Sequence, residues 1–117
     1  MEFETAFDLL SNEYRRAVVA LLDEEGSVPR DKLTARLLAR GVGVSAEDDR
    51  TNRRQLRIAL HHNHLPRLAD AGVVTDDGEA ITPTEELADL AAWLDESSHV
   101  APTATTDLDD QLLAFYA

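Results

Sequence analysis

Residues 50–74, RTNRRQLRIALHHNHLPRLADAGVV, contain the longest helical pattern of this sequence and its densest cluster of positive charge. Five arginines and no acidic residue lie within residues 50–69, although the chain as a whole has a formal net charge of −12. Four of the arginines follow the spacing i, i+3, i+4 and i+7, which places them on one face of a helix. These four are Arg50, Arg53, Arg54 and Arg57. We therefore expect a basic helix over about residues 46–70, followed by a short strand.

The apolar residues of this helix and its proline make two further predictions. Pro66 cannot donate a hydrogen bond to the carbonyl of His62, so a kink or break is expected there. Leu56 and Leu60 lie on one flank of the arginines and Ile58 lies on the other. We therefore expect the helix to be wedged between its neighbours and to expose only a narrow strip.

Length and composition limit the class of protein. A chain of 117 residues is long enough for one domain with a real core, which must consist of Leu, Ala and Val because aromatic residues make up only 5%. No apolar run approaches the roughly 20 residues that cross a membrane. The acidic start MEFETAFD lacks the basic region of a signal peptide, and the absence of cysteine excludes disulfides and thiolate chemistry. A soluble cytoplasmic protein is expected.

The charged residues have an unusual composition, with many acids and almost no lysine. The chain has 23 acidic residues, ten arginines and one lysine, Lys32. Excess carboxylates stay hydrated in concentrated salt, and their mutual repulsion is screened there, because the Debye length falls to roughly 3 Å at 1 M salt. This composition indicates adaptation to molar salt, as in haloarchaea. A mesophilic acidic protein is the alternative.

Outward from the basic helix, the chain alternates helical patterns with short breaks. We expect helices over about residues 1–10, 11–25 and 29–40, with Ser11 as a cap and a very short strand near residues 27–28. Ser45 is the predicted N-cap of the basic helix. After it, Asp76-Asp77-Gly78 predicts a hairpin turn between strands 73–75 and 79–82. The expected fold class is mainly α with a small β-hairpin.

A further helix is expected to start after the hairpin, with Thr82 as N-cap and Pro83 at its first position, and to end near residue 97. The segment 98–106 is rich in Pro, Ala and Thr and is predicted to be a linker. Residues 107–117 then form a short C-terminal helix with Phe115 and Tyr116 on its apolar face. The predicted organisation is thus one domain over residues 1–97, a linker and a terminal helix.

The order of these elements, together with particular residues, resembles winged helix-turn-helix proteins. LLSNEYRR (9–16) is similar to the first-helix start of ArsR-like transcriptional regulators, and HLPRLADAGVV (64–74) is similar to their exit from the recognition helix. The combination of both segments resembles a haloarchaeal winged-helix domain of unknown function over about residues 7–85. The segment HHNHLPRLADAGVV is the most specific part of this resemblance.

The resemblance implies a function for individual residues. It makes the helix over 46–70 a recognition helix for double-stranded DNA, with Leu65, Leu68 and Val73 in the core. It also implies a homodimer formed through terminal helices. The chain departs from the pattern of this class in three ways. The wing tip holds Asp76, Asp77 and Glu79 instead of basic residues, which counts against DNA binding. The second helix has only four basic residues, and the ordinary repressor pattern lacks Pro66. The candidate DNA-binding residues are Arg50, Arg53, Arg54, Arg57, His61, His64 and, for phosphate only, Arg67.

Each candidate has a structural alternative. The arginines can pair with nearby carboxylates, since Asp49 with Arg53 and Glu47 with Arg50 are at helical pairing distance. His61 and His64 share a face of an α-helix, but metal ligands on a helix usually stand at i and i+4. No metal or other cofactor is therefore predicted, and His64 can instead be a packed core histidine.

Two hypotheses remain for the whole chain. The first is a DNA-binding transcriptional regulator, and the second is a winged-helix module that binds another protein and not DNA. The sequence has no catalytic Ser/His/Asp spacing, no Gly-rich phosphate loop and no carboxylate metal motif, so no enzyme is predicted.

Overall fold

The computed structural model describes residues 2–101, and their side chains as far as residue 95. The helical elements are α1 (Phe3–Leu9), α2 (Glu13–Glu25), α3 (Arg30–Ala39), α4 (Asp49–Ala59), the π-helical turn η1 (Leu60–His64), α5 (Leu65–Asp70) and α6 (Glu85–Ala101). The strands are β1 (Val28–Pro29), β2 (Val74–Asp76) and β3 (Ala80–Pro83). The protein is therefore mainly helical with a small sheet, as the sequence predicts.

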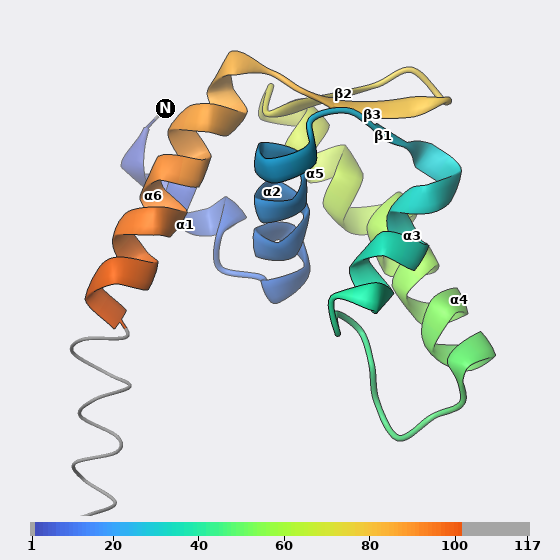
Figure 1. Cartoon of the computed structure of the whole chain (residues 1–117). Helices are drawn as coiled ribbons and strands as arrows, with labels where there is room; N and C mark the ends of the chain where they lie inside the picture. Colours follow the sequence, from blue (N-terminus) through green and yellow to red (C-terminus); the bar gives the residue numbers. More distant parts are fainter. Residues whose placement is uncertain (1, 102–117) are drawn as a thin grey trace, which may run out of the picture.

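The three strands form one antiparallel sheet in the order β1-β3-β2. Val28 of β1 lies opposite Ile81 of β3, and Thr75 of β2 lies opposite Thr82. Figure 1 shows the sheet along one end of the helices, with α6 leaving it at one edge of the molecule and α4 lying at the opposite edge. The predicted short strand before α3 thus becomes the third strand of the sheet and joins the start of α3 to the hairpin.

The core is built from aliphatic side chains of every helix and strand. The predicted core residues Leu65, Leu68 and Val73 are buried. No aromatic side chain occurs among the largest fully buried ones of the described chain, in keeping with the low aromatic content. Those largest side chains are Leu21, Leu22, Leu33, Leu37, Leu56, Leu60, Leu65, Leu68, Ile81, Leu90, Val18 and Val19.

Three predicted helix caps are wrong by one to three residues. Asn12 caps α2 by accepting hydrogen bonds from the N–H groups of Tyr14 and Arg15, whereas the N–H of Ser11 still bonds to α1. Asp48 caps α4 through the N–H of Thr51. Pro83 is the last residue of β3, so α6 starts two residues later than predicted, after Thr84.

The kink predicted near Pro66 takes the form of the π-helical turn η1. The N–H of Leu65 bonds to the carbonyl of Leu60, five residues back. This wider turn places Pro66 in the first turn of α5, where its missing N–H and its ring are tolerated. The expected helix over 46–70 is therefore three consecutive segments, α4, η1 and α5, and the side chains of α5 are rotated relative to those of α4.

The exposure of α4 corrects another expectation. Only Asn52 and Leu56 of this helix are buried, and Ile58 is 46% exposed. The helix is not wedged between neighbours. It lies across α3 with one narrow buried strip and presents a broad face to solvent.

At the other edge of the molecule, α6 continues to residue 101 and so overlaps the start of the predicted linker. The helix predicted over residues 107–117 lies outside the described residues.

Candidate functional site

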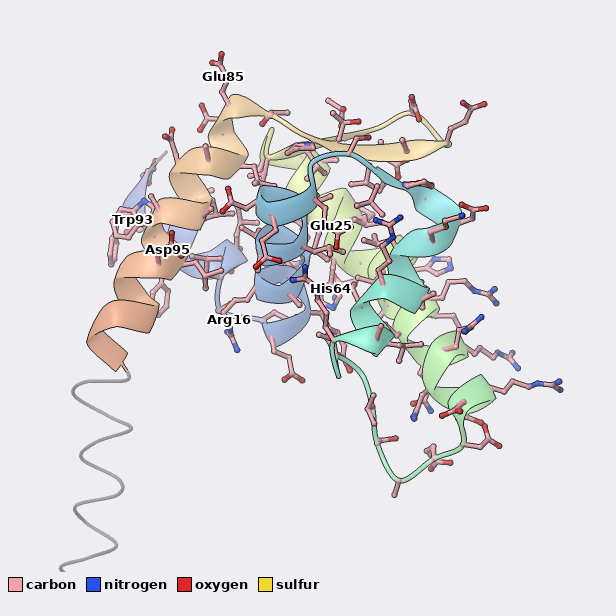
Figure 2. The ribbon with its side chains drawn as sticks, in the orientation of Figure 1. Arg16, Glu25, His64, Glu85, Trp93 and Asp95 are labelled. Atoms are coloured by element: carbon pink, nitrogen blue, oxygen red, sulfur yellow. The ribbon has the colours of Figure 1, made fainter. Side chains whose placement is uncertain are left out.

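The four predicted arginines of α4 all lie on its exposed face. Figure 2 shows nitrogen-tipped side chains projecting outward from this helix. Within residues 2–95, the side chains of Arg50, Arg53, Arg54 and Arg57 make no hydrogen bond and no ion pair. The alternative that they pair with Glu47 or Asp49 is therefore not what the structure adopts.

The other arginines of the chain are all engaged within the fold. Arg15 and Arg16 donate to backbone carbonyls at the end of α1. Arg30 bonds to Asp76, and Arg67 bonds to Asn63 at 2.9 Å and lies 4.0 Å from Asp8. Arg36 of α3 and Arg40, the residue after its last turn, form ion pairs with Glu24 and Glu25 of α2. The α4 arginines thus differ from the rest in having no internal partner in the described structure.

A hollow of about 330 Å³ lies beside the arginine face, between α3, α4 with η1, and the β2–β3 turn. Arg53, Arg57 and His61 line it from one side. Arg30, at the start of α3, lines the other side, and its Nε donates to Asp76 Oδ2 at 3.0 Å. Arg30 was not a predicted site residue, because only the pairing of β1 with β3 brings it to the hairpin. We call the hollow lined by these residues the α3–α4 hollow.

His61 is half-buried at the edge of the α3–α4 hollow. Burial is the main cause that lowers the pKa of its imidazole, and the positive charges of Arg30, Arg57 and His62 lower it further. Asp76 acts in the opposite direction. The lowered pKa favours the neutral imidazole relative to an ordinary histidine, and in that form one ring nitrogen donates a hydrogen bond and the other accepts one.

The acidic tip of the hairpin has structural roles. Asp76 Oδ1 accepts the N–H of Gly78, and Asp77 Oδ1 accepts those of Glu79 and Ala80. These backbone hydrogen bonds lower the pKa of the Asp77 carboxyl. Gly78 has φ +89°, a conformation that the turn requires and that glycine adopts without strain. Two of the three acids that argued against a nucleic-acid contact thus build the turn itself.

His64 is not a surface residue, which corrects its place among the predicted contacts. It is 3% exposed and lies in the interior, where Figure 2 shows it between the helices. Its Nδ1 lies 3.1 Å from Nη1 of Arg15, and its ring packs against Tyr14 at 5.5 Å between centroids. Residues of a π turn advance less around the axis than those of an α-helix, so His64 points away from the face that carries His61.

The Arg15–His64 contact is a buried polar centre that sequence analysis did not find. Arg15 is 5% exposed, and its Nε and Nη2 donate to the carbonyls of Leu9 and Asp8 at 2.8 and 3.0 Å. An arginine is only a donor, so Nδ1 of His64 must accept and the ring must be neutral. Burial, followed by the charges of Arg15 and Arg67, lowers the pKa of His64. The pair ties α1, α2 and η1 together.

A second surface is apolar. Phe3 and Phe7 of α1 are 59% and 68% exposed and stack at 6.1 Å, and Phe3 meets Trp93 of α6 edge-on at 5.3 Å. A hollow of about 440 Å³ lies among them, with Leu10 and Leu94 also in its lining. We call this the α1–α6 apolar face. It lies at the opposite edge of the molecule from α4 (Figure 1).

The described part of the chain has neither a metal-binding cluster nor a membrane-spanning helix. That part has no group of three or more His, Asp or Glu side chains arranged to hold a metal ion. It also has no helix with the length and apolar character needed to cross a membrane.

Comparison with known proteins assigns a family and no function. A family model described as a domain of unknown function, DUF7344, matches residues 7–84, and the chain therefore belongs to this family. No curated protein and no solved structure matches the chain. The matched residues run from α1 through β3, so they include the whole arginine face and the α3–α4 hollow. Phe3 and Trp93 of the α1–α6 apolar face lie outside the match.

Proposed function

We propose that this chain is a DNA-binding transcriptional regulator with winged helix-turn-helix architecture. In this proposal α3 and α4 are the helix-turn-helix pair, α4 with η1 is the recognition helix in the major groove, and β2 with β3 is the wing. Helix, strand, helix, helix, hairpin is the element order of that class, and the strand that precedes α3 joins the hairpin as the class requires. Recognition helices of this kind place their exposed side chains against base edges.

The observation that carries the proposal is that the four arginines of α4 are unpaired in the described structure. The chain has 23 acidic residues, yet the four arginines of α4 have no acidic partner in the described structure while every other arginine is engaged. A guanidinium pairs bidentately with guanine or with phosphate. These four side chains make no hydrogen bond or ion pair in the described structure and lie on one face of an exposed helix, so they are available for such a partner.

The charge of the chain around the proposed interface is consistent with DNA binding in concentrated salt. Binding that depends on released counterions weakens by about 0.9 log unit per log unit of salt for each phosphate neutralised. A chain of net charge −12 gains little from general attraction to DNA. Under these conditions, binding has to come from a few unpaired arginines that contact base edges and individual phosphates. We accordingly place this regulator in the cytoplasm of a halophilic archaeon.

A second candidate is a winged-helix protein-interaction module, and the α1–α6 apolar face favours it. Phe3, Phe7 and Trp93 form an apolar surface that is unusual on a chain so rich in charge. The same face is also where we expect the homodimer that a regulator with two half-sites needs. Because this face lies at the opposite edge of the molecule from α4, its use by a second copy or by another protein leaves the arginine face open (Figure 1).

Charge reversal on α4 tests the proposal. Arg53→Glu/Arg57→Glu is expected to abolish binding to a DNA duplex, measured by fluorescence anisotropy in about 1–2 M potassium chloride, because it replaces two contacts by two repulsions. Gln55→Glu is the matched control, since it adds a negative charge to the same helix beside the loop of residues 41–45. Duplex binding that survives the double reversal would sink the proposal. If the unaltered chain binds another protein but no DNA duplex, the second candidate is favoured.

A further inference from the structure

The α3–α4 hollow gathers positive charge from parts of the chain that are distant in sequence. Arg30 comes from the first residue of α3, Arg53 and Arg57 come from α4, and His61 comes from η1. The fold brings them together because β1 pairs with β3 and because α3 packs on α4. The hollow is therefore a feature of the tertiary structure and not of one helix surface.

The hydrogen-bond donors of this hollow are largely unused. Arg30 uses its Nε–H for Asp76, and that bond fixes the plane of its guanidinium. A guanidinium has five N–H groups, so the four on the Nη atoms of Arg30 stay available. Arg53 and Arg57 use none of theirs in the described structure. Several N–H donors thus face one space without an acceptor.

The charges around the hollow favour an anion. Three arginines line it or face it, and the carboxylates there are those of Asp31, in the lining, and Asp76, which is bonded to Arg30. The local balance is positive on a strongly negative chain. The lowered pKa of His61 agrees with this, because burial and the neighbouring cations make a further positive charge unfavourable at the ring.

We propose that the α3–α4 hollow binds one phosphate group, with Arg30 and Arg57 as its main donors and His61 as a further hydrogen-bond partner. The volume is at the lower end of the roughly 300–1,000 Å³ of small-molecule sites, so a phosphate fits with part of the group that carries it. Arginine matches phosphate geometry bidentately. The phosphate belongs either to the backbone of a duplex, which rests on the proposed function, or to a free phosphate ester.

Asp76 acts as a positioning residue in this site. Its Oδ1 accepts the N–H of Gly78 in the hairpin turn, while its Oδ2 holds Arg30. The turn therefore sets the place of the carboxylate, and the carboxylate sets the place of the guanidinium. This explains how a hairpin with an acidic tip can contribute to a phosphate site without a basic residue of its own.

The test is an NMR titration of the full chain with inorganic phosphate, exchanged for chloride at constant ionic strength. The readouts are the imidazole signals of His61, assigned with His61→Gln, and the arginine Nε–H signals. We expect saturable shifts, and binding weaker by about tenfold or more in Arg57→Gln, because charge-assisted hydrogen bonds are lost. Lys32→Gln, which removes one exposed positive charge of α3 outside the hollow, is the control and should bind as the unaltered chain does. Arg57 has no internal partner in the described structure, so its substitution leaves the fold intact.

Further arms identify the source of the phosphate and separate this proposal from the one above. Shifts of His61 with a nucleoside monophosphate but no binding of any duplex would keep the phosphate site and end the proposal of a DNA-binding regulator. Duplex binding that shifts Arg57, with no shift of His61 by phosphate, nucleotide or duplex, would keep the regulator and end the phosphate site. The absence of any saturable shift with phosphate, nucleotide and duplex, or equal affinities in Arg57→Gln and the unaltered chain, would overturn the phosphate site.

Discussion

Arg15 and the arginines of α4 show two opposite uses of one residue type. Arg15 is buried, donates to two backbone carbonyls and to His64, and holds three elements together. Arg53 and Arg57 are exposed and make no bond within the described structure. The difference separates cations that maintain the fold from cations that are free for an external partner. Substitutions should therefore divide the arginines into those that change stability and those that change binding.

The largest loss of stability is expected at Arg15. Arg15→Met removes a buried cation together with its hydrogen bonds to the Leu9 carbonyl and to Nδ1 of His64, while the Asp8 carbonyl keeps its bonds from Ser11. We expect the free energy of unfolding to fall by about 3 kcal/mol, because each lost hydrogen bond from a charged group costs about 1.5–3 kcal/mol. The measurement is chemical denaturation in about 2 M potassium chloride. Arg16→Met is the control, since Arg16 is only half-buried and donates to the single carbonyl of Leu10. Equal losses in the two variants would contradict the role given to Arg15.

The next effect is a dependence of stability on pH through His64. Its pKa in the folded chain is below the ordinary value of about 6.5, so the unfolded chain binds more protons near pH 6. The stabilisation is present above about pH 6.5 and is lost as the pH falls below it, by at most about 1.4 kcal/mol per pH unit. His61, whose pKa is also lowered, contributes in the same direction.

Unfolding measured between pH 7 and pH 5.5 tests this dependence. His64→Gln keeps an acceptor for Arg15 and removes the titrating ring, so the slope should become shallower. His62→Gln makes the same substitution at an exposed ring of the same π turn and is the variant for comparison. A slope in His64→Gln as steep as that of the unaltered chain would show that the Arg15–His64 contact is not its source.

A smaller effect is expected from the ion pairs between α2 and α3. Arg36→Gln removes an exposed pair with Glu25. Surface pairs of this kind contribute about 0–1 kcal/mol, and salt weakens them. The free energy of unfolding should therefore change by less than about 1 kcal/mol in molar salt. A loss as large as that of Arg15→Met would mean that paired surface arginines, and not the buried one, hold the helices together.

The smallest effect on stability is expected at α4. Arg53→Gln/Arg57→Gln removes two charges that have no partner in the described structure. The free energy of unfolding should therefore change by no more than about 0.5 kcal/mol. Exposed α4 side chains that prove necessary for folding would remove the contrast with Arg15. The same variant keeps helix propensity nearly unchanged, which makes it a clean comparison.

Much of the fold could be predicted from sequence because its signals are local. The helix expected over 29–40 is found as α3, the Asp-Asp-Gly turn forms the hairpin, and the periodic Leu65 and Leu68 are buried. Neighbouring residues can cap equally well, so the sequence pattern favours Ser11 and Ser45, whereas Asn12 and Asp48 cap the helices in the structure. The sequence shows which residues can cap but not which of them leaves the helical conformation.

The candidate site was only partly predictable, for long-range reasons. The arginine face of α4 follows from spacing alone. His64 lies inside because a π turn rotates it toward Arg15, which is 49 residues away in sequence. Arg30 joins Arg53 and Arg57 only through strand pairing. Whether the α4 arginines pair with Glu47 or Asp49 is a choice between geometries that spacing permits equally, so their lack of partners becomes visible only in three dimensions.

We propose that the unpaired arginines of α4 recognise DNA. The most direct test of this claim is the anisotropy of a labelled duplex from upstream of the chain's own coding sequence, titrated in about 1–2 M potassium chloride, where general phosphate attraction is weak. We predict saturable binding that a scrambled duplex does not match and that Arg50→Gln/Arg53→Gln/Arg54→Gln/Arg57→Gln removes while the protein stays folded. Equal affinity for the two duplexes, no binding to either, or full binding by the quadruple variant would contradict the claim.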